Sequence, residues 1–208
     1  MQLEVKAAGP LPREALEYFR RKKLAPDLDL DAAWPEEHDF AFKVAGVAAE
    51  DLLADLQKAV DRALEQGLTY RDFAAGLDDV LGALGWIGED GKPARRLKLI
   101  YDTHMRVARA AGQWDRIVRT AEDGRAYLEY QLGPAAKHRE EHVGWAGTIL
   151  RYNNVWWSTH FPPNGFGCHC RVRQLSDAEA ERRGISGSTP GGEPDPGWDR
   201  NPGATRGA

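Results

Sequence analysis

Histidine and cysteine residues gather in one part of the chain. Both cysteines and five of the six histidines follow position 100, and most of them lie between His138 and Cys170. His138 and His142 are four residues apart and would share one face of a helix, whereas Cys168 and Cys170 are two apart and would share one face of a strand. Imidazole nitrogens and thiolate sulfurs are ligands that zinc prefers. The pattern predicts a zinc site with the ligands His142, His160, Cys168 and Cys170, and with His138 and His169 as alternates.

A structural interpretation of the same residues stays open beside the metal site. The C-x-C spacing is shorter than the two to four residues that usually separate paired zinc cysteines. In a reducing cytosol, Cys168 and Cys170 could be small buried side chains, and the histidines could hydrogen-bond within turns. A disulfide between the two cysteines would be strained, because the Cα separation and Cβ directions across one residue fit poorly.

The segment HREEH, residues 138–142, allows an alternative interpretation as the metal site of an enzyme. It matches the H-x-x-E-H pattern of an inverted zinc-peptidase motif, in which two histidines hold zinc and a glutamate, here Glu141, activates water. The acidic candidates downstream for a third ligand, such as Glu179 and Glu181, precede a tail rich in Gly and Pro. The chain has neither a phosphate-binding glycine motif nor a G-x-S-x-G elbow. We therefore expect a protein without enzymatic activity, with a metal-dependent hydrolase as the alternative.

The residues before position 120 have the pattern of helices. Apolar residues recur at the spacing of an amphipathic helix, Gly67 is a helix-ending residue, and Thr69 stands three residues before Asp72 in a capping-box-like pattern. A break rich in turn residues, 85–93, precedes the longest helical pattern. The expected helices are 11–23, 40–66, 69–84 and 93–119.

The residues after position 120 favour strands separated by turns. The runs RAYLEYQL, TILRYNNVWW and CHCRVRQL are β-favouring. The loop PPNGFG, residues 162–167, is rigid because its prolines fix φ, and Trp156 and Trp157 are expected to pack beneath it. A short helix is expected from near Ser176 to before Gly184. The fold class is therefore α+β: a helical module at 1–119, a small α+β module with a short antiparallel sheet and a His/Cys-rich turn at 120–183, and a Gly/Pro-rich tail at 184–208, flexible on composition alone.

Charge is unevenly distributed along the 208 residues. The formal net charge is −4, so the chain as a whole lacks the positive excess of a dedicated nucleic-acid binder. Residues 27–39 form an acidic stretch, which predicts a solvated connector or, less simply, a surface for a partner. Residues 92–119 are basic, and two interpretations stay open: a solvated helix face, or a surface for nucleic acid or an acidic partner. The basic residues that would form that surface include Arg95, Arg96, Lys98, Arg106, Arg109 and Arg116.

No apolar run approaches the roughly 18 to 20 residues that cross a bilayer, and the first residues lack the apolar core of a secretory signal. We therefore expect no membrane association and an origin in the cytoplasm.

Three segments together carry a family resemblance. RTAEDGRAYLEY, HREEHVGWAGTIL and WWSTHFPPNGFGCHCRVRQLS resemble the phage Mu protein F-like family of minor head, or head morphogenesis, proteins. The resemblance covers roughly residues 12–183, and GWDRNPGA near the end is similar to a further family element, which argues against a flexible tail. The elements of the family signature fall on Arg139, His142, Gly147, Trp157, Pro162, Pro163, Asn164, Gly165, Cys168, Cys170 and Arg171.

The resemblance implies a structural component of the virion, present in few copies at the head or portal vertex, and in the host cytoplasm during assembly. The implied partners are the portal protein and capsid or scaffold proteins, with DNA as a further contact during packaging. The chain departs from the family at His169, where arginine is common, and this adds one histidine to the candidate ligands.

Overall fold

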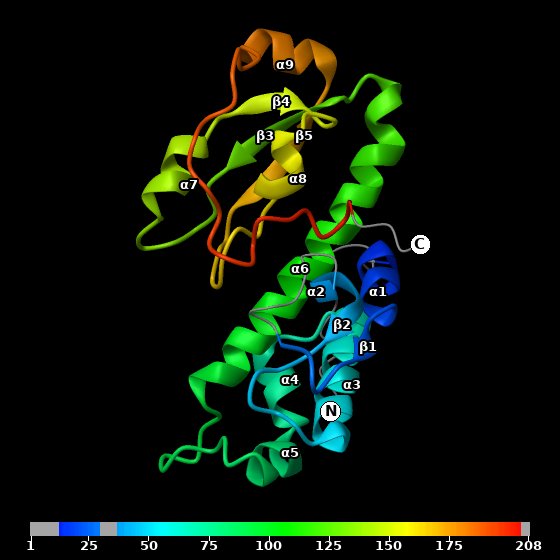
Figure 1. Cartoon of the computed structure of the whole chain (residues 1–208), viewed down its shortest axis with the longest axis vertical. Coiled ribbons are helices and arrows are strands. Elements are labelled where there is room, and N and C mark those ends of the chain that lie inside the picture. Colours follow the sequence, from blue (N-terminus) through cyan, green and yellow to red (C-terminus); the bar gives the residue numbers. More distant parts are fainter. Residues whose placement is uncertain (1–12, 30–36, 205–208) are drawn as a thin grey trace, which may run out of the picture. The chain divides into compact units, whose positions relative to one another are not determined.

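The computed structural model describes residues 13–29 and 37–204 (Figure 1). The chain divides into two compact units, Met1–Arg109 and Ala110–Ala208. Helix α6, Arg95–Thr120, contributes residues to both units, so the boundary lies ten residues before the expected one at position 119. The expected α+β class is confirmed, with helices dominating the first part and a small antiparallel sheet in the second.

The first unit consists mainly of helices. A two-residue parallel pairing joins β1 to β2. The predicted end of the second helix is confirmed, since Gly67 adopts a left-handed conformation with φ of 65°. The predicted cap is also confirmed, because the Thr69 side chain accepts a hydrogen bond from the backbone N–H of Asp72. The elements are α1 (Arg13–Arg20), β1 (Lys23–Leu24), α2 (Glu37–Phe40), β2 (Ala41–Phe42), α3 (Glu50–Gln66), α4 (Tyr70–Ala75) and α5 (Asp78–Ala83).

Several predicted boundaries in the first unit are wrong. The first helix ends at Arg20, and residues 11 and 12 of its expected range lie outside the described part. The second helix begins at Glu50 rather than Phe40, because strand β2 interrupts the apolar pattern. The expected third helix is two short helices, because the chain turns at Gly76 and Leu77. The spacing of apolar residues locates these helices but does not locate the interruptions between them.

The acidic stretch at 27–39 is not solvated throughout. Asp39 is 1% exposed and accepts a hydrogen bond of 2.7 Å from the hydroxyl of Tyr18. Asp27 and Asp29 are exposed, as a connector requires, and residues 30–36 lie outside the described part. The prediction of a solvated connector is therefore wrong for Asp39, which is buried and hydrogen-bonded to Tyr18 of α1.

The second unit contains a three-stranded antiparallel sheet with the order β4-β3-β5. Central strand β3 pairs with both neighbours, so Tyr127 lies opposite Arg151 on one side and Leu175 on the other. The predicted cap of the last helix is confirmed, since the Ser176 side chain accepts from the N–H of Glu179. The elements after α6 are a 3-10 turn (Ala121–Asp123), β3 (Tyr127–Gln131), α7 (Glu140–Trp145), β4 (Ile149–Arg151), α8 (Trp156–His160), β5 (Arg171–Leu175) and α9 (Asp177–Arg183).

Two strand predictions in this unit need correction. The run TILRYNNVWW forms a strand only at Ile149–Arg151, and its two tryptophans begin helix α8. The cysteines lie just before β5 rather than within it, so strand alternation does not bring them together. The β preference of aromatic residues is weak enough for tertiary packing to override it here.

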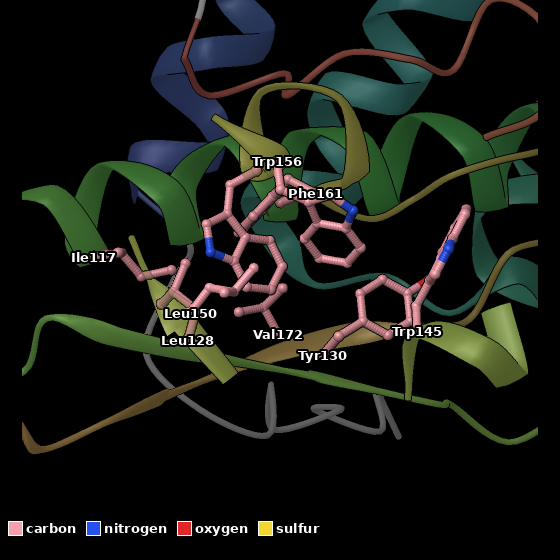
Figure 2. Packing of buried hydrophobic residues seen from close by; sticks show 10 residues of the cluster. Ile117, Leu128, Tyr130, Trp145, Leu150, Trp156, Phe161 and Val172 are labelled. Atoms are coloured by element: carbon pink, nitrogen blue, oxygen red, sulfur yellow. The ribbon is translucent and has the colours of Figure 1, made fainter. Parts of the chain in front are cut away.

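Aromatic side chains fill the core of the second unit (Figure 2). Figure 2 shows Tyr130 beside Trp145 at one end of the cluster, where their ring centroids are 5.7 Å apart. The predicted burial of both neighbouring tryptophans is confirmed, because Trp156 is 6% exposed and Trp157 is fully buried. Each buried indole removes about 200 Å² from water, a transfer free energy on the order of 5 kcal/mol. These rings therefore provide much of the stability of the small sheet.

The residues from Gly184 to Ala204, here called the C-terminal strap, pack against the second unit. In Figure 1 this orange-to-red segment runs from α9 past α7. The indole N–H of Trp145 donates to the Gly191 carbonyl at 2.8 Å, and Trp198 is 8% exposed and packs edge-on against Phe166. Flexibility inferred from Gly and Pro content is therefore wrong for the strap, because long-range contacts hold it in place.

Among the described residues, no helix combines the length and the apolar character that a membrane crossing requires.

His104 makes the stability of the first unit depend on pH. The imidazole stacks on Phe42 at 4.7 Å and meets Phe19 edge-on at 6.0 Å. Desolvation among these rings lowers the pKa of His104 to about 3, and the positive charge of Lys22 acts in the same direction. The unfolded chain protonates this imidazole near pH 6.5, whereas the folded chain does so only near pH 3. The stability that the neutral, buried imidazole provides is therefore fully present above pH 6.5 and is lost as the pH falls toward 3.

We expect the free energy of unfolding to fall between pH 7 and pH 5 by about 2 kcal/mol more in the wild-type chain than in His104→Leu. Urea unfolding followed by far-UV circular dichroism at the two pH values measures this difference. The same pH dependence in both proteins would contradict the assignment of a neutral, desolvated imidazole.

Candidate metal centre

Three predicted ligands meet in the second unit. The Nδ1 atom of His142 lies 3.8 Å from the sulfur of Cys168 and 3.5 Å from the sulfur of Cys170. The three ligand atoms all lie within 4.8 Å of one another, and among the described residues this is the group of His, Cys, Asp and Glu suited to hold a metal ion. His142 and Cys168 are buried, while Cys170 is partly exposed.

Helix α7 and the loop before β5 bring these ligands together. α7 begins at Glu140, which places His142 in its first turn, and the imidazole stacks on Trp145 with ring centroids 4.8 Å apart. The other ring nitrogen of His142, Nε2, is buried and has no hydrogen-bond partner among the described residues, so the stacking on Trp145 and the contacts of Nδ1 with the two sulfurs orient the ring. In the loop, the N–H of Cys168 donates to the Gly165 carbonyl at 3.1 Å, which closes a turn around the first cysteine.

The distances fit a tetrahedral zinc ion. Zinc–sulfur bonds of about 2.3 Å and zinc–nitrogen bonds of about 2.0–2.1 Å, at a tetrahedral angle, place sulfur and nitrogen about 3.6 Å apart. The two observed distances between sulfur and Nδ1 are 3.5 and 3.8 Å. Both sulfur–nitrogen distances are therefore close to those of such a site, and the donor set of two sulfurs and one imidazole is one that zinc prefers.

The two thiols are electrostatically unequal. Hydrogen bonding between them lowers the pKa of Cys170 and raises the pKa of Cys168, and burial raises the latter further. A hydrogen bond with His142 also lowers the pKa of Cys170. The environment thus favours one thiolate on Cys170 before any metal binds, whereas a coordinated ion would deprotonate both thiols.

Residues around the ligands were not identified from the sequence. Tyr130 is buried and its hydroxyl donates to Oδ1 of Asn164 at 3.0 Å, which joins the sheet to the PPNGFG loop. Gly133 follows β3, and a Cβ added there would lie 1.7 Å from the backbone oxygen of His169, between the two cysteines. Neither residue carries a local signal for these roles, because both contacts join segments more than thirty residues apart.

The other histidines considered as ligands lie elsewhere. His160 ends α8, and its ring stacks on Trp156 with centroids 4.4 Å apart. Its Nδ1 is 2.7 Å from the Thr159 hydroxyl and its Nε2 is 3.1 Å from the Gly192 carbonyl. The Nε2 atom of His138 lies 2.7 Å from the Gly133 carbonyl. His160, His138 and His169 are not members of the group of converging ligands.

The geometry of a zinc peptidase is not present in HREEH. That motif requires both histidines on one helix face, but α7 begins at Glu140, so His138 precedes the helix. Glu141 is exposed on α7. The segment places His142 at the metal group and leaves His138 out of it.

The remaining signature residues support the loop and the strap. An Nη2 atom of Arg139 lies 2.6 Å from a carboxylate oxygen of Asp195 and donates to the Phe166 carbonyl, so it joins α7, the loop and the strap. A Cβ on Gly165 would lie 2.2 Å from the same carboxylate, which explains the glycine. Pro162 and Pro163 are buried and joined by a cis peptide bond, Gly147 has φ of 81°, and Arg171 donates to Gln131 at 3.1 Å.

Half of the predicted basic surface is engaged within the first unit. Arg96 lies over the ring of Trp86 at 4.8 Å, Lys98 pairs with Asp102 at 2.5 Å, and Arg106 is partly buried. Arg95, Arg109 and Arg116 are exposed, and Arg96 and Lys98 are exposed as well despite these contacts. Contact of these residues with DNA or an acidic partner stays a prediction.

Comparison with known proteins assigns the chain to a family. Residues 54–173, more than half of the chain, match the model of the phage Mu protein F like protein family. This region contains β3, β4, the first residues of β5, α7, α8 and all three converging ligands. The chain belongs to the phage Mu protein F-like family.

Two relatives are similar to the chain over most of its length. The putative capsid assembly protein F of Escherichia phage Mu is 33% identical over 193 residues, 86% of this chain and 44% of that protein. The Mu-like prophage FluMu F protein of Haemophilus influenzae is 30% identical over 165 residues, 75% of this chain and 40% of that protein. The chain thus spans less than half the length of each relative. No solved structure shows significant similarity to it.

We expect Gly133→Ala to destabilise the second unit by roughly 3 kcal/mol or more. The added methyl group would collide with the backbone of His169, and the backbone could move away only by distorting the loop that holds the two cysteines. Gly144→Ala is the matched control, because Gly144 is exposed on α7 and a Cβ there meets no atom within 4 Å. It should be neutral or slightly stabilising. Thermal unfolding of the two variants compares them directly, and equal melting temperatures would contradict the close approach at Gly133.

Proposed function

We propose that the chain is a structural component of a phage head that acts during head assembly. Membership of the Mu protein F-like family supports this role, and so does similarity to a protein named as a putative capsid assembly protein. Within that role we propose a position at the portal vertex, in few copies, with the portal protein and capsid or scaffold proteins as partners. DNA entering the head during packaging is a further proposed contact.

The observation that best supports this proposal is that residues of the family signature form contacts that join the elements of the second unit to one another. Arg139 pairs with Asp195, Asn164 accepts from Tyr130, and Gly165 allows the close approach of that aspartate. These contacts join α7, the sheet, the loop and the strap to one another. Such a framework is what a rigid assembly module needs, and it favours a structural role over the hydrolase alternative.

We further propose that zinc binds to His142, Cys168 and Cys170 and has a structural role. Two sulfurs and one imidazole at the spacing of a tetrahedral site support this proposal. Bound zinc would supply folding free energy, which reaches about 10 kcal/mol or more in small zinc-dependent peptides. In a unit with three short strands, that contribution would tie the loop before β5 to α7.

Cryo-electron microscopy of heads from a phage or prophage that encodes this chain tests the assembly role. We expect density for the protein at one vertex of the head, beside the portal. Heads that form in normal number when the coding sequence is deleted, or a protein spread evenly over the capsid, would contradict the proposal.

Metal content tests the zinc site. Protein purified under reducing conditions should carry close to one zinc per chain. His142→Gln, Cys168→Ser and Cys170→Ser should each lose the metal and lower the melting temperature by about 10 °C or more. His138→Gln is the matched control and should keep the zinc, because His138 lies outside the converging group. A zinc-free wild-type protein, or equal loss in His138→Gln and His142→Gln, would overturn the assignment.

A further inference from the structure

The metal group has three ligands where a structural zinc site has four. Structural zinc is almost always held by four protein ligands, whereas three protein ligands leave a position for water or another donor. Among the described residues, no fourth His, Cys, Asp or Glu joins His142, Cys168 and Cys170. A fourth ligand from the described residues would have to come from a side chain outside this group.

His160 is the fourth ligand expected from the sequence, and its contacts hold it elsewhere. Both ring nitrogens are engaged, one with the Thr159 hydroxyl and one with the Gly192 carbonyl of the strap. The ring is also stacked on Trp156 at an interplanar angle of 16° and meets Trp145 edge-on at 4.8 Å. To reach the metal group, His160 would have to leave the aromatic core and release the strap.

The other nearby donors are also committed to different partners. His138 is within hydrogen-bond distance of the Gly133 carbonyl. The hydroxyl of Tyr130 donates to Oδ1 of Asn164 at 3.0 Å, and a neutral phenol is not among the ligands that zinc prefers. Cys170 is partly exposed, in contrast to His142 and Cys168, so its side of the group is the one nearer to solvent.

We propose that the zinc ion bound at this group has three ligands among the described residues and a fourth position that an external nitrogen donor of the imidazole type can occupy. This inference rests on the proposed zinc site and goes beyond it, because a purely structural site would be closed. Water fills the position when no stronger donor is present. Imidazole is a suitable donor because it is neutral, monodentate and well matched to zinc.

Cobalt substitution of the full chain tests the fourth position. Co²⁺ takes up the same N and S ligands as zinc and reports its coordination through visible d–d absorption bands. We expect the bands of the cobalt-substituted wild-type protein to change saturably when imidazole is added. The His160→Gln variant should respond with the same half-saturation, because the amide can keep the contact to Gly192 and the residue is not a ligand.

A closed site gives the opposite result. Absorption bands of the wild-type protein that do not change with imidazole would overturn the proposal, and a response that appears only in His160→Gln would identify His160 as the fourth ligand. The wild-type titration is decisive even if the variant folds poorly. Cobalt bound with unresponsive bands refutes the open position but leaves the metal site intact, whereas failure to bind either cobalt or zinc refutes both.

Discussion

The second unit depends on the meeting of two sulfurs and one imidazole from distant parts of the chain. Cys168 and Cys170 lie 26 and 28 residues after His142, yet both sulfurs lie within 3.8 Å of its Nδ1 atom. A helix, a strand end and a loop must all be placed correctly to achieve this. The loop can approach the end of β3 only because Gly133 has no side chain there, since the His169 carbonyl occupies the space that a Cβ would need. This convergence therefore fixes α7, the end of β3 and the loop before β5 relative to one another.

The aromatic core and the C-terminal strap are coupled to the same point. Trp145 stacks on His142 with one face and donates its indole N–H to the strap at Gly191. Arg139, at the start of α7, pairs with Asp195 of the strap and contacts the loop at Phe166. Loss of order at the ligands would therefore loosen the core and the strap together. This coupling supplies long-range contacts to a unit that has only three short strands, as the proposed role in head assembly would require.

Local signals in the sequence predicted much of the fold. The long helix α6, the caps at Thr69 and Ser176 and the helix end at Gly67 depend on spacing and on nearest neighbours, so they could be identified directly. The C-terminal strap could not, because its order comes from contacts with α7 and the loop rather than from its composition. The same limit applies to the site: residue type and clustering identified three converging ligands, but stacking on Trp156 holds His160 elsewhere. The supporting residues Tyr130, Gly133 and Asp195 act only across long sequence separations and had no local signature.

In the proposed zinc site, one zinc ion joins α7 to the loop before β5. X-ray absorption at the zinc edge tests it most directly, because the first coordination shell reports ligand type and distance in the intact protein. We expect two sulfur atoms at about 2.3 Å and lighter nitrogen or oxygen atoms at about 2.0–2.1 Å. A first shell without sulfur would contradict the assignment of Cys168 and Cys170 as ligands. A shell with only nitrogen and oxygen would show that any metal present is bound elsewhere.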